Sequence, residues 1–491
     1  MEITSLWQHV PTGALNFAVR TKPLRNKLMK IADEKIYNKF VVQNAEKWPV
    51  GVQEGRYRML MNLFHALNKA ISDGRLSSKV SKAIIGNFVT RTLLGQQERV
   101  AHFNREYNMY PPGFLTISPT KRCNLFCTGC YASSSAGDAE TLRYDILNRI
   151  IKDKQQSWGS YFTVISGGEP LLYRDGKKTF FDFLEDNQND YFMMYTNGTL
   201  ITKDVARKMA DLGNVTPAIS VEGFEKETDE RRGKGVYAKI MRAMDNLKEA
   251  GVPFGVSATA TRKNVDKIMS DKFIDFYFKQ AGAIYGWIFQ YMPIGRSYTT
   301  DLMISPDQRL ELFKREEKMI KESNIFLVDF WNGGPYTVGC ISAGRPGGYF
   351  YIDWNGNAAP CAFYPYFTSN LYNVYKENKT LNDVLFSPYF KSIRSWQTDY
   401  GFNQPPEKVK NYIVPCIMRD HFDNAFSIVN KHHAKPMDVN AELALADDVY
   451  QERMREYGKD ANELTQEYWE KIFKKDSASA GKEKAKGEMS E

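Results

Sequence analysis

Three cysteines within eight residues constrain this chain more than any other feature of its sequence. Cys123, Cys127 and Cys130 follow an apolar run, residues 114–118, that predicts a buried strand. Three thiolates on one loop can hold three irons of a [4Fe-4S] cubane and leave the fourth iron open to a small chelating molecule. A zinc site is the alternative, but zinc needs four ligands and only His102 is nearby. The spacing therefore favours an iron–sulfur cluster at the end of the strand.

Short apolar runs alternate with helical patterns after residue 113. The helical stretches 203–212 and 237–250 end at Gly213 and Gly251. The expected strands are residues 114–118, 161–166, 191–196, 216–221, 254–260 and 287–292. Six strand–helix units with both sheet faces covered predict parallel strands, so we expect an α/β fold, a partial (β/α)6 barrel. Chemistry in such a barrel gathers at the carboxyl ends of the strands.

The cysteine triplet resembles the signature of the radical S-adenosylmethionine (SAM) superfamily. A second motif, Gly167-Gly168-Glu169-Pro170, follows the second strand and resembles the family segment that binds the SAM amino group. The resemblance implies a catalytic [4Fe-4S] cluster on Cys123, Cys127 and Cys130, with SAM as the cofactor. One position departs from the common form, because Gly129 stands where the family usually has an aromatic residue near the adenine. Tyr131 is the expected replacement for that contact.

Later strand ends supply less specific candidates for the SAM site. Asn197 lies in a segment that resembles one lining this site, and Tyr291-Met292-Pro293-Ile294-Gly295 resembles a segment that cradles adenine through backbone groups. Residues 220–223 resemble the family's Ser-x-Asp-Gly, with Glu222 in the acidic position. Ser220 is a candidate for the SAM carboxylate or ribose, and Arg232 for the carboxylate. Both residues are equally compatible with simple turn roles.

The other three cysteines lie in the C-terminal third of the chain. Cys340, Cys361 and a glycine turn between them, residues 353–357, resemble the opening of the SPASM or twitch module of many radical SAM proteins. Cys416 would close this site, and the resemblance implies one probable second [4Fe-4S] cluster. Three cysteines leave one iron either open or bound by a non-cysteine group such as Asp420 or His421. The alternative is that all three are buried free cysteines.

The chain divides into segments of different composition. No segment has the pattern of a secretion signal or an apolar membrane span. We therefore expect a cytoplasmic protein, and peripheral contact with a membrane is the alternative. The predicted segments are a basic amphipathic helical region (1–112), a radical SAM core barrel (113–300), a helical bridge (301–335), an auxiliary cluster module (336–427), a C-terminal helical segment (428–473) and a disordered tail (474–491).

The excess positive charge is confined to the N-terminal segment. Residues 1–112 contain 17 Lys and Arg against 8 Asp and Glu, a net charge of +9, whereas the remaining residues carry −1. Basic amphipathic helices suit anionic membrane surfaces. The first expectation is therefore an enzyme that cleaves SAM reductively to a 5′-deoxyadenosyl radical and abstracts hydrogen from a membrane lipid.

Two other functions remain open from the sequence. A radical SAM maturase that modifies a peptide or protein is the enzyme alternative, since the fold does not choose the substrate. An iron–sulfur electron carrier is the non-enzyme alternative, although it leaves the Gly167–Pro170 motif without a role. The expected partner is a reducing electron donor such as ferredoxin or flavodoxin, and no nucleic acid is expected.

Overall fold

A ten-stranded sheet forms the centre of the protein. The computed structural model describes residues 18–44, 47–94 and 97–474. In spatial order the strands are β13 (Ser369–Asn370), β11 (Asn357–Ala359), β10 (Tyr351–Ile352), β1 (Leu115–Ile117), β2 (Phe162–Ile165), β5 (Tyr191–Thr196), β6 (Val215–Val221), β7 (Gly255–Ala260), β8 (Tyr285–Gln290) and β9 (Phe326–Asp329). Strands from β10 to β9 are parallel, and β11 and β13 run antiparallel. The six strands expected from the sequence are confirmed.

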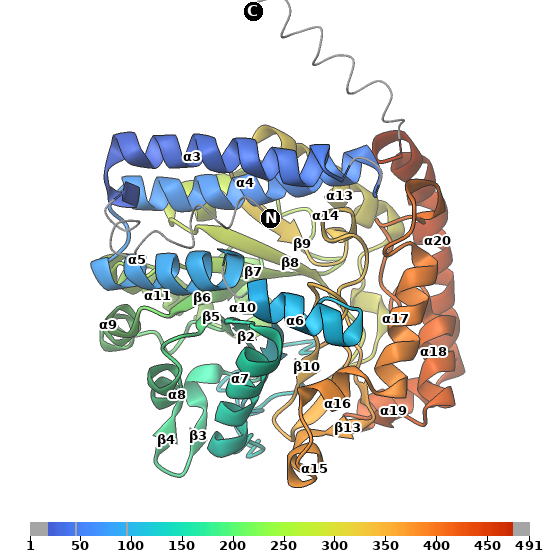
Figure 1. The fold of residues 1–491 in the computed structure, drawn as a ribbon. Coiled ribbons are helices and arrows are strands. Elements are labelled where there is room, and N and C mark those ends of the chain that lie inside the picture. The colour runs from blue at the N-terminus through green and yellow to red at the C-terminus, as the bar shows by residue number, and fades with distance from the viewer. Residues whose placement is uncertain (1–17, 45–46, 95–96, 475–491) are drawn as a thin grey trace, which may run out of the picture.

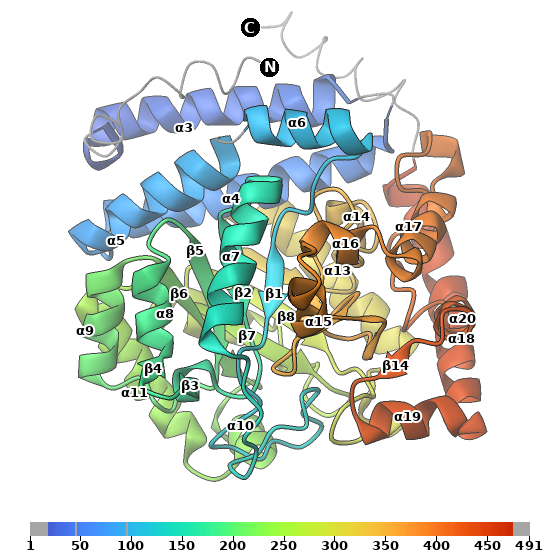
Figure 2. The same ribbon diagram turned by 60° about the horizontal axis from the view of Figure 1, so that its bottom comes forward.

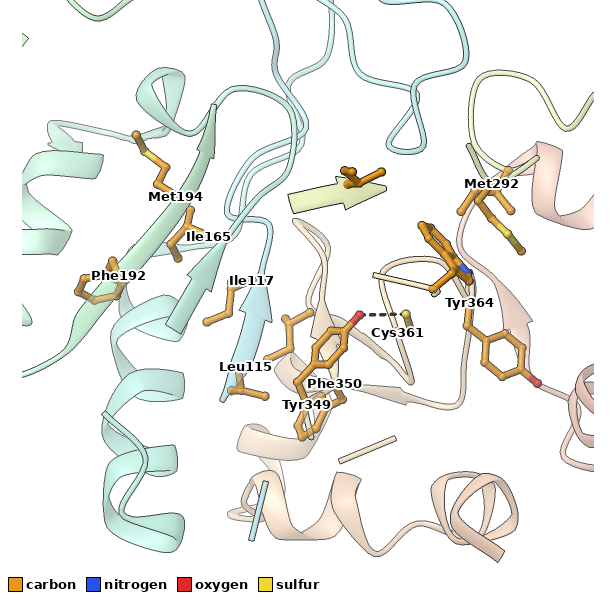
Figure 3. Packing of buried hydrophobic residues seen from close by; sticks show 14 of the residues in the cluster. Leu115, Ile117, Ile165, Phe192, Met194, Met292, Tyr349, Phe350, Cys361 and Tyr364 are labelled. Carbon is orange, nitrogen blue, oxygen red and sulfur yellow. Dashed lines mark hydrogen bonds between the residues drawn. The ribbon is translucent and has the colours of Figure 1, made fainter. Parts of the chain in front are cut away.

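Side chains alternate between the two buried faces of the sheet. Leu115 and Ile117 are fully buried and share one core cluster with Ile165, Phe192 and Met194, as Figure 3 shows. The intervening residues point into the barrel and line a cavity there. Because side chains have a period of two along a strand, one apolar run supplies both the outer core and the inner wall.

Helices cover the outer face of the sheet (Figure 2). α9 and α11 end at Leu212 and Ala250, as expected, and a glycine in the left-handed conformation follows each. The helices between strands are α7 (Tyr144–Trp158), α8 (Phe180–Asp186), α9 (Lys203–Leu212), α10 (Glu225–Arg232), α11 (Val236–Ala250), α12 (Asp271–Ile274) with η4 (Asp275–Gln280), and α13 (Pro306–Glu322). Shorter elements are η3 (Pro170–Leu172), β3 (Arg174–Asp175), β4 (Lys178–Thr179) and η5 (Thr300–Leu302).

The N-terminal region is helical, as predicted, and lies against the barrel (Figure 1). Its elements are α3 (Lys22–Tyr37), η1 (Asn38–Val42), α4 (Val50–Ser72), α5 (Ser78–Ala83), η2 (Ile84–Leu94) and α6 (Gln97–Tyr107). Met59, Leu63 and Leu67 of α4 pack against a cluster that includes Val164 and Val328 of the inner barrel wall. The apolar face of α4 is therefore covered by the barrel itself.

The sheet continues beyond the six expected strands. Residues 301–335, predicted as a helical bridge, contain α13 but also β9, which adds a parallel strand beside β8. On the other side, β10 pairs with β1, and the β10–β11 hairpin turns at residues 353–357 as predicted. Residues of the expected auxiliary module thus extend the core sheet.

The C-terminal helices pack side by side on one flank (Figure 1). The elements are α14 (Gly334–Thr337), α15 (Leu371–Lys376), α16 (Leu381–Leu385), α17 (Pro388–Tyr400), η6 (Pro406–Lys408), α18 (Phe422–Lys431), α19 (Val439–Ala446) and α20 (Asp448–Ile472), with β12 (Tyr366–Phe367) paired to β14 (Lys435–Pro436). Apart from Lys474, the tail predicted over 474–491 lies outside the described residues. Within the described chain, no helix combines the length and apolarity needed to cross a bilayer.

Candidate active site

The cysteine loop leaves the carboxyl end of β1 and folds back on the Gly167–Pro170 motif. A Cβ atom on Gly168 would stand 2.2 Å from the carbonyl oxygen of Arg122 and 2.3 Å from that of Lys121. Gly168 also donates its backbone N–H to Thr120, and Glu169 donates to Arg122. Gly168 is therefore required for close packing against the cysteine loop. The sequence alone had indicated only a role for this motif in binding SAM.

Cys123 is the buried member of the triplet, and Cys127 and Cys130 are partly exposed. The backbone N–H of Leu125 donates to the Cys123 sulfur at 3.5 Å, and the Asn197 side-chain amide lies 3.8 Å from it. Burial raises the pKa of the Cys123 thiol to about 12. Cluster binding must therefore displace a proton from this thiol.

Arg296 holds the cysteine loop from the side of β8, and sequence reasoning missed it. Its backbone N–H donates to the Cys130 carbonyl at 2.9 Å, and its guanidinium donates to the carbonyl oxygens of Cys127 and Ser134. The guanidinium also stacks 3.6 Å from the ring centroid of the exposed Phe126. The one sequence feature that could have indicated Arg296 is its position directly after the segment expected to hold adenine.

A cavity of about 1080 Å³ opens beside this loop and extends through the barrel. The structure brings most of the predicted site residues to it. Its lining includes Cys123, Cys127, Cys130, Tyr131, Gly167, Gly168, Asn197, Ser220 and Arg232. Glu169 and Pro170 are buried behind this wall. This volume is at the upper end of small-ligand pockets.

Glu169 lies behind the cavity wall at the end of β2. Its carboxylate accepts hydrogen bonds from the Thr196 hydroxyl and the Asn197 backbone N–H, both at 2.8 Å. Burial raises the pKa of Glu169 to about 7, although these bonds favour the ionised form. Asn197 also donates its side-chain amide to Asn124 of the cysteine loop. The second and third strand ends are thus tied to the cluster loop.

Two tyrosines stand near the position where the family usually has an aromatic residue. Gly129 has φ +63°, and a Cβ atom there would lie 2.5 Å from the ring of Tyr291. Tyr131 points elsewhere: its hydroxyl lies 2.6 Å from that of Ser166, and its ring centroid is 5.5 Å from that of Phe363. Tyr291 therefore fills the space beside Gly129, and Tyr131 lines a different part of the cavity.

Arg232 reaches the cavity but is already paired. Its Nε donates to Glu222 at 2.8 Å, and Arg231 donates to the same carboxylate oxygen. Glu222 is fully buried, so this ion pair anchors the end of β6 as well as facing the site. Ser220 lies on the same wall. The contacts of Ser220 and Arg232 with SAM remain predictions.

Comparison with known proteins agrees with this geometry. Residues 117–266 match the family model of the Radical SAM superfamily. This segment is a radical SAM domain. A [4Fe-4S] cluster and SAM are the cofactors of such domains, as the resemblance of the cysteine triplet implied.

Several curated proteins are similar to this chain. The AdoMet-dependent heme synthase of Methanosarcina barkeri is 26% identical over 289 residues, covering 53% of this chain and 79% of the synthase. The mycofactocin maturase MftC of Mycolicibacterium smegmatis is 33% identical over 168 residues, covering 33% of this chain and 41% of the maturase. The chain thus spans less than half the length of that maturase. A crystal structure of Streptococcus suis SuiB bound to precursor peptide SuiA aligns with a TM-score of 0.48 at 20% identity, covering 61% of this chain and 70% of that one.

The second cysteine set also comes together. Cys340, Cys361 and Cys416 line a separate cavity of about 30 Å³. The Tyr349 hydroxyl lies 2.9 Å from the Cys361 sulfur (Figure 3), and the Ser342 hydroxyl lies 3.2 Å from the Cys340 sulfur. This SPASM/twitch-like set is gathered from three distant segments.

The two residues expected to give a fourth ligand to the second set are engaged elsewhere. Asp420 is fully paired with Arg309, whose Nη2 donates to it at 3.1 Å, and it accepts the Cys416 backbone N–H at 3.0 Å. The Nε2 of His421 lies 2.9 Å from the Val414 carbonyl oxygen. Neither residue lines the small cavity. The structure therefore does not bring Asp420 or His421 to the three thiols.

The donor atoms at both sites suit iron–sulfur clusters. Within the described residues, no three His, Cys, Asp or Glu side chains stand close enough to hold a single metal ion. Thiolates that share one zinc need that spacing, whereas thiolates on a cubane bind different irons and stand further apart. His102, the other zinc candidate, is exposed and lies 3.5 Å from Glu106. The cavity beside the second set, about 30 Å³, is much smaller than the one beside the first.

Further groups that sequence reasoning missed lie between and beside the two sites. Phe330, Thr337, Ile341 and Phe363 line both cavities. Asp329, at the end of β9, also lines the large cavity and accepts a hydrogen bond from Gln290 at 2.9 Å. The signal for Asp329 was an apolar run, residues 326–328, followed by a carboxylate, the same pattern as at other strand ends.

Proposed function

We propose that this protein is a radical SAM enzyme that modifies a peptide or protein substrate. The main observation in support of this proposal is the cavity of about 1080 Å³. It reaches from the cysteine loop to residues 402–405 and exceeds what SAM alone requires. The similarity to a mycofactocin maturase supports a peptide as the class of substrate. Because the chain spans only part of that maturase, the activity itself is the proposal.

The residues at the carboxyl ends of the strands have complementary roles in this proposal. Cys123, Cys127 and Cys130 hold the catalytic cluster. Glu169 in its ionised form and the backbone of Gly167 and Gly168 bind the SAM amino group. Tyr291 packs against the adenine from the position beside Gly129.

When bound, the cluster and SAM supply a 5′-deoxyadenosyl radical that removes a hydrogen atom from the substrate. A reducing donor such as ferredoxin or flavodoxin provides the electron for SAM cleavage. Aromatic residues of the cavity, including Trp287, Phe289 and Phe363, exclude water and hold the substrate carbon near this point. Phe330, Thr337, Ile341 and Phe363 lie between the substrate space and the second cysteine set, so an electron left on the substrate has a short path to it.

A membrane lipid, the first substrate expected from the sequence, has less support. The apolar face of α4 packs on the barrel, and Arg25 turns inward to donate to the Val19 carbonyl and the Ser72 hydroxyl. Exposed cations of the proposed membrane surface remain, among them Lys22, Lys27 and Lys30 of α3 and Lys39 of η1. Cosedimentation with anionic liposomes at two salt concentrations tests it, since an electrostatic attraction weakens as salt rises.

The peptide proposal is tested with the anaerobically reconstituted protein. Incubation with SAM, dithionite and synthetic peptides encoded beside its gene is expected to give 5′-deoxyadenosine and a peptide of altered mass. A Cys123→Ala variant is the control and should give neither product. Formation of 5′-deoxyadenosine with no change in any peptide, together with salt-sensitive liposome binding, would return the lipid substrate to first place.

A further inference from the structure

Two arginines face the large cavity, and neither has a carboxylate partner among the described residues. Arg56 of α4 and Arg345, which follows the second-set residue Cys340, both line it. Arg345 is 3% exposed and packs near the start of β1, where Gly347 donates to the Pro111 carbonyl at 3.1 Å. The cysteine loop lies at the other end of β1. Both arginines therefore stand across the cavity from the catalytic thiols.

The guanidinium groups have few polar contacts with the protein. Arg345 donates from Nη2 to the carbonyl oxygens of Thr337 and Gly339, whereas its buried Nε has no hydrogen-bond partner. Its Nη1 makes no hydrogen bond to a described residue and is not sealed off by protein. Arg56 forms no hydrogen bond or ion pair with any described residue and contacts only the rings of Phe40 and Trp48, 4.8 and 4.7 Å away. Arg345 lies 4.3 Å from the ring centroid of Phe402.

The charges that surround this pair are of the same sign. Lys47 lines the same region, and Asp329 is the one carboxylate among the described residues of the cavity lining. Asp329 is hydrogen-bonded to Gln290 and to the backbone of Trp331 and Asn332. Burial, and after it repulsion from Arg345, lowers the pKa of Arg56 to about 10. Arg345 is buried and Arg56 is half-buried, and cations in such a setting without an anion are costly, so the pair is poised to receive one.

The second cysteine set does not account for both charges. Thiolates there would balance part of the charge on Arg345, because Cys340 is close enough to raise its pKa against the larger lowering by burial. Arg56 has no such thiolate beside it and instead stands among Phe40, Trp48 and Arg345. A role confined to the second cluster therefore leaves Arg56 unexplained.

We propose that Arg56 and Arg345 form a carboxylate-binding subsite for the peptide substrate, which rests on the proposed function above. The two forks bind the C-terminal carboxylate or an Asp or Glu side chain of the peptide, with Trp48 and Phe402 packing on its apolar part. The anchored carboxylate then sets which residue of the peptide reaches the end of the cavity beside Cys123, Cys127 and Cys130. The expected substrate is thus a peptide that presents a free carboxylate to this subsite.

The subsite is tested by binding, with no turnover required. The probes are N-acetyl-phenylalanine and its primary amide, which differ only in the charged group, titrated calorimetrically into the full-length anaerobic protein. The carboxylate is expected to bind at least roughly tenfold more tightly than the amide, and Arg56→Gln or Arg345→Gln to remove that preference. Arg58→Gln is the matched control, because Arg58 is on the same helix, exposed and outside the cavity lining.

Other outcomes overturn the subsite. Equal binding of acid and amide, or an unchanged preference in both Gln variants, rules it out. If Arg345→Gln does not fold, Arg56→Gln alone decides, because Arg56 makes no hydrogen bond to lose. Binding of coproporphyrin III through both arginines without binding of the acylated amino acid would assign the subsite to a tetrapyrrole and overturn the peptide. Formation of 5′-deoxyadenosine by the wild-type protein is measured separately, so a failure of the proposed activity is distinct from a failure of the subsite.

Discussion

Cys123, Cys127 and Cys130 lie on one loop beside a cavity of about 1080 Å³, whereas Cys340, Cys361 and Cys416 come from three segments and enclose about 30 Å³. Burial raises the pKa of Cys123 and of Cys361 alike to about 12, so both sets must lose protons on binding iron. What separates them is the space beside them. The first set borders the large cavity, whereas the second borders a small one whose lining shares Phe330, Thr337, Ile341 and Phe363 with the large cavity.

The strongest test of this contrast removes the first set. Replacing Cys123, Cys127 and Cys130 with Ala should abolish SAM cleavage and roughly halve the iron from about eight per chain, because one of two cubanes is lost. Iron analysis and chromatography of 5′-deoxyadenosine measure both effects. A triple variant that still forms 5′-deoxyadenosine would place the catalytic cluster elsewhere.

Removing the second set should have a smaller and different effect. Replacement of Cys340, Cys361 and Cys416 with Ala is expected to lower iron by a similar amount but to leave uncoupled SAM cleavage, since that step needs only the first cluster. Peptide modification should be lost. Unchanged iron in folded Cys361→Ala protein would show that these are free buried cysteines.

A pH series sharpens the description of the first site. The raised pKa of Glu169, about 7, means that its carboxyl is largely protonated at pH 6 and ionised at pH 7.5. SAM affinity should therefore rise roughly fivefold to tenfold over that interval, while the ligand's amino group stays mostly protonated. Glu169→Gln should abolish the rise, and Glu185→Gln, an exposed residue of α8, should retain it.

The same pKa has a consequence for stability without ligand. A carboxyl whose pKa is higher in the folded state stabilises the fold below its unfolded pKa of about 4.5, and this contribution is lost as pH rises through about 7. Glu169→Gln protein should therefore gain thermal stability relative to wild type on going from pH 6 to pH 8. A constant difference between the two proteins would indicate that Glu169 is not desolvated.

The smallest expected effect concerns Tyr349 at the second site. Its hydroxyl can donate to the Cys361 sulfur, and such bonds favour the reduced, more negative cluster. Tyr349→Phe should shift the midpoint potential of that cluster by about 20–60 mV to more negative values, the equivalent of one hydrogen bond. Tyr351→Phe is the control, because its hydroxyl bonds to Ser118. An equal shift in both variants would assign the effect to general repacking.

Sequence reasoning located the six core strands and the helices that end at Gly213 and Gly251, since these depend on local periodicity and on glycine after a helix. It missed β9, because the apolar run of residues 326–328 is too short to identify a strand without its pairing to β8. The role of Tyr291 beside Gly129 was equally out of reach. That contact depends on how the end of β8 meets the cysteine loop.

The sequence by itself determined the class of chemistry, because all three ligands of the first site lie within eight residues and their spacing survives any tertiary arrangement. The sequence also predicted that Cys416 joins Cys340 and Cys361, but tertiary structure alone decided that Asp420 pairs with Arg309 and that Arg56 lines the same cavity as Arg345. These contacts join residues far apart in the chain, and their formation depends on which apolar faces are buried together. The basic N-terminal helices are an example. The sequence showed their charge, but only the structure shows that the apolar face of α4 packs on the barrel and that Arg56 lines the cavity.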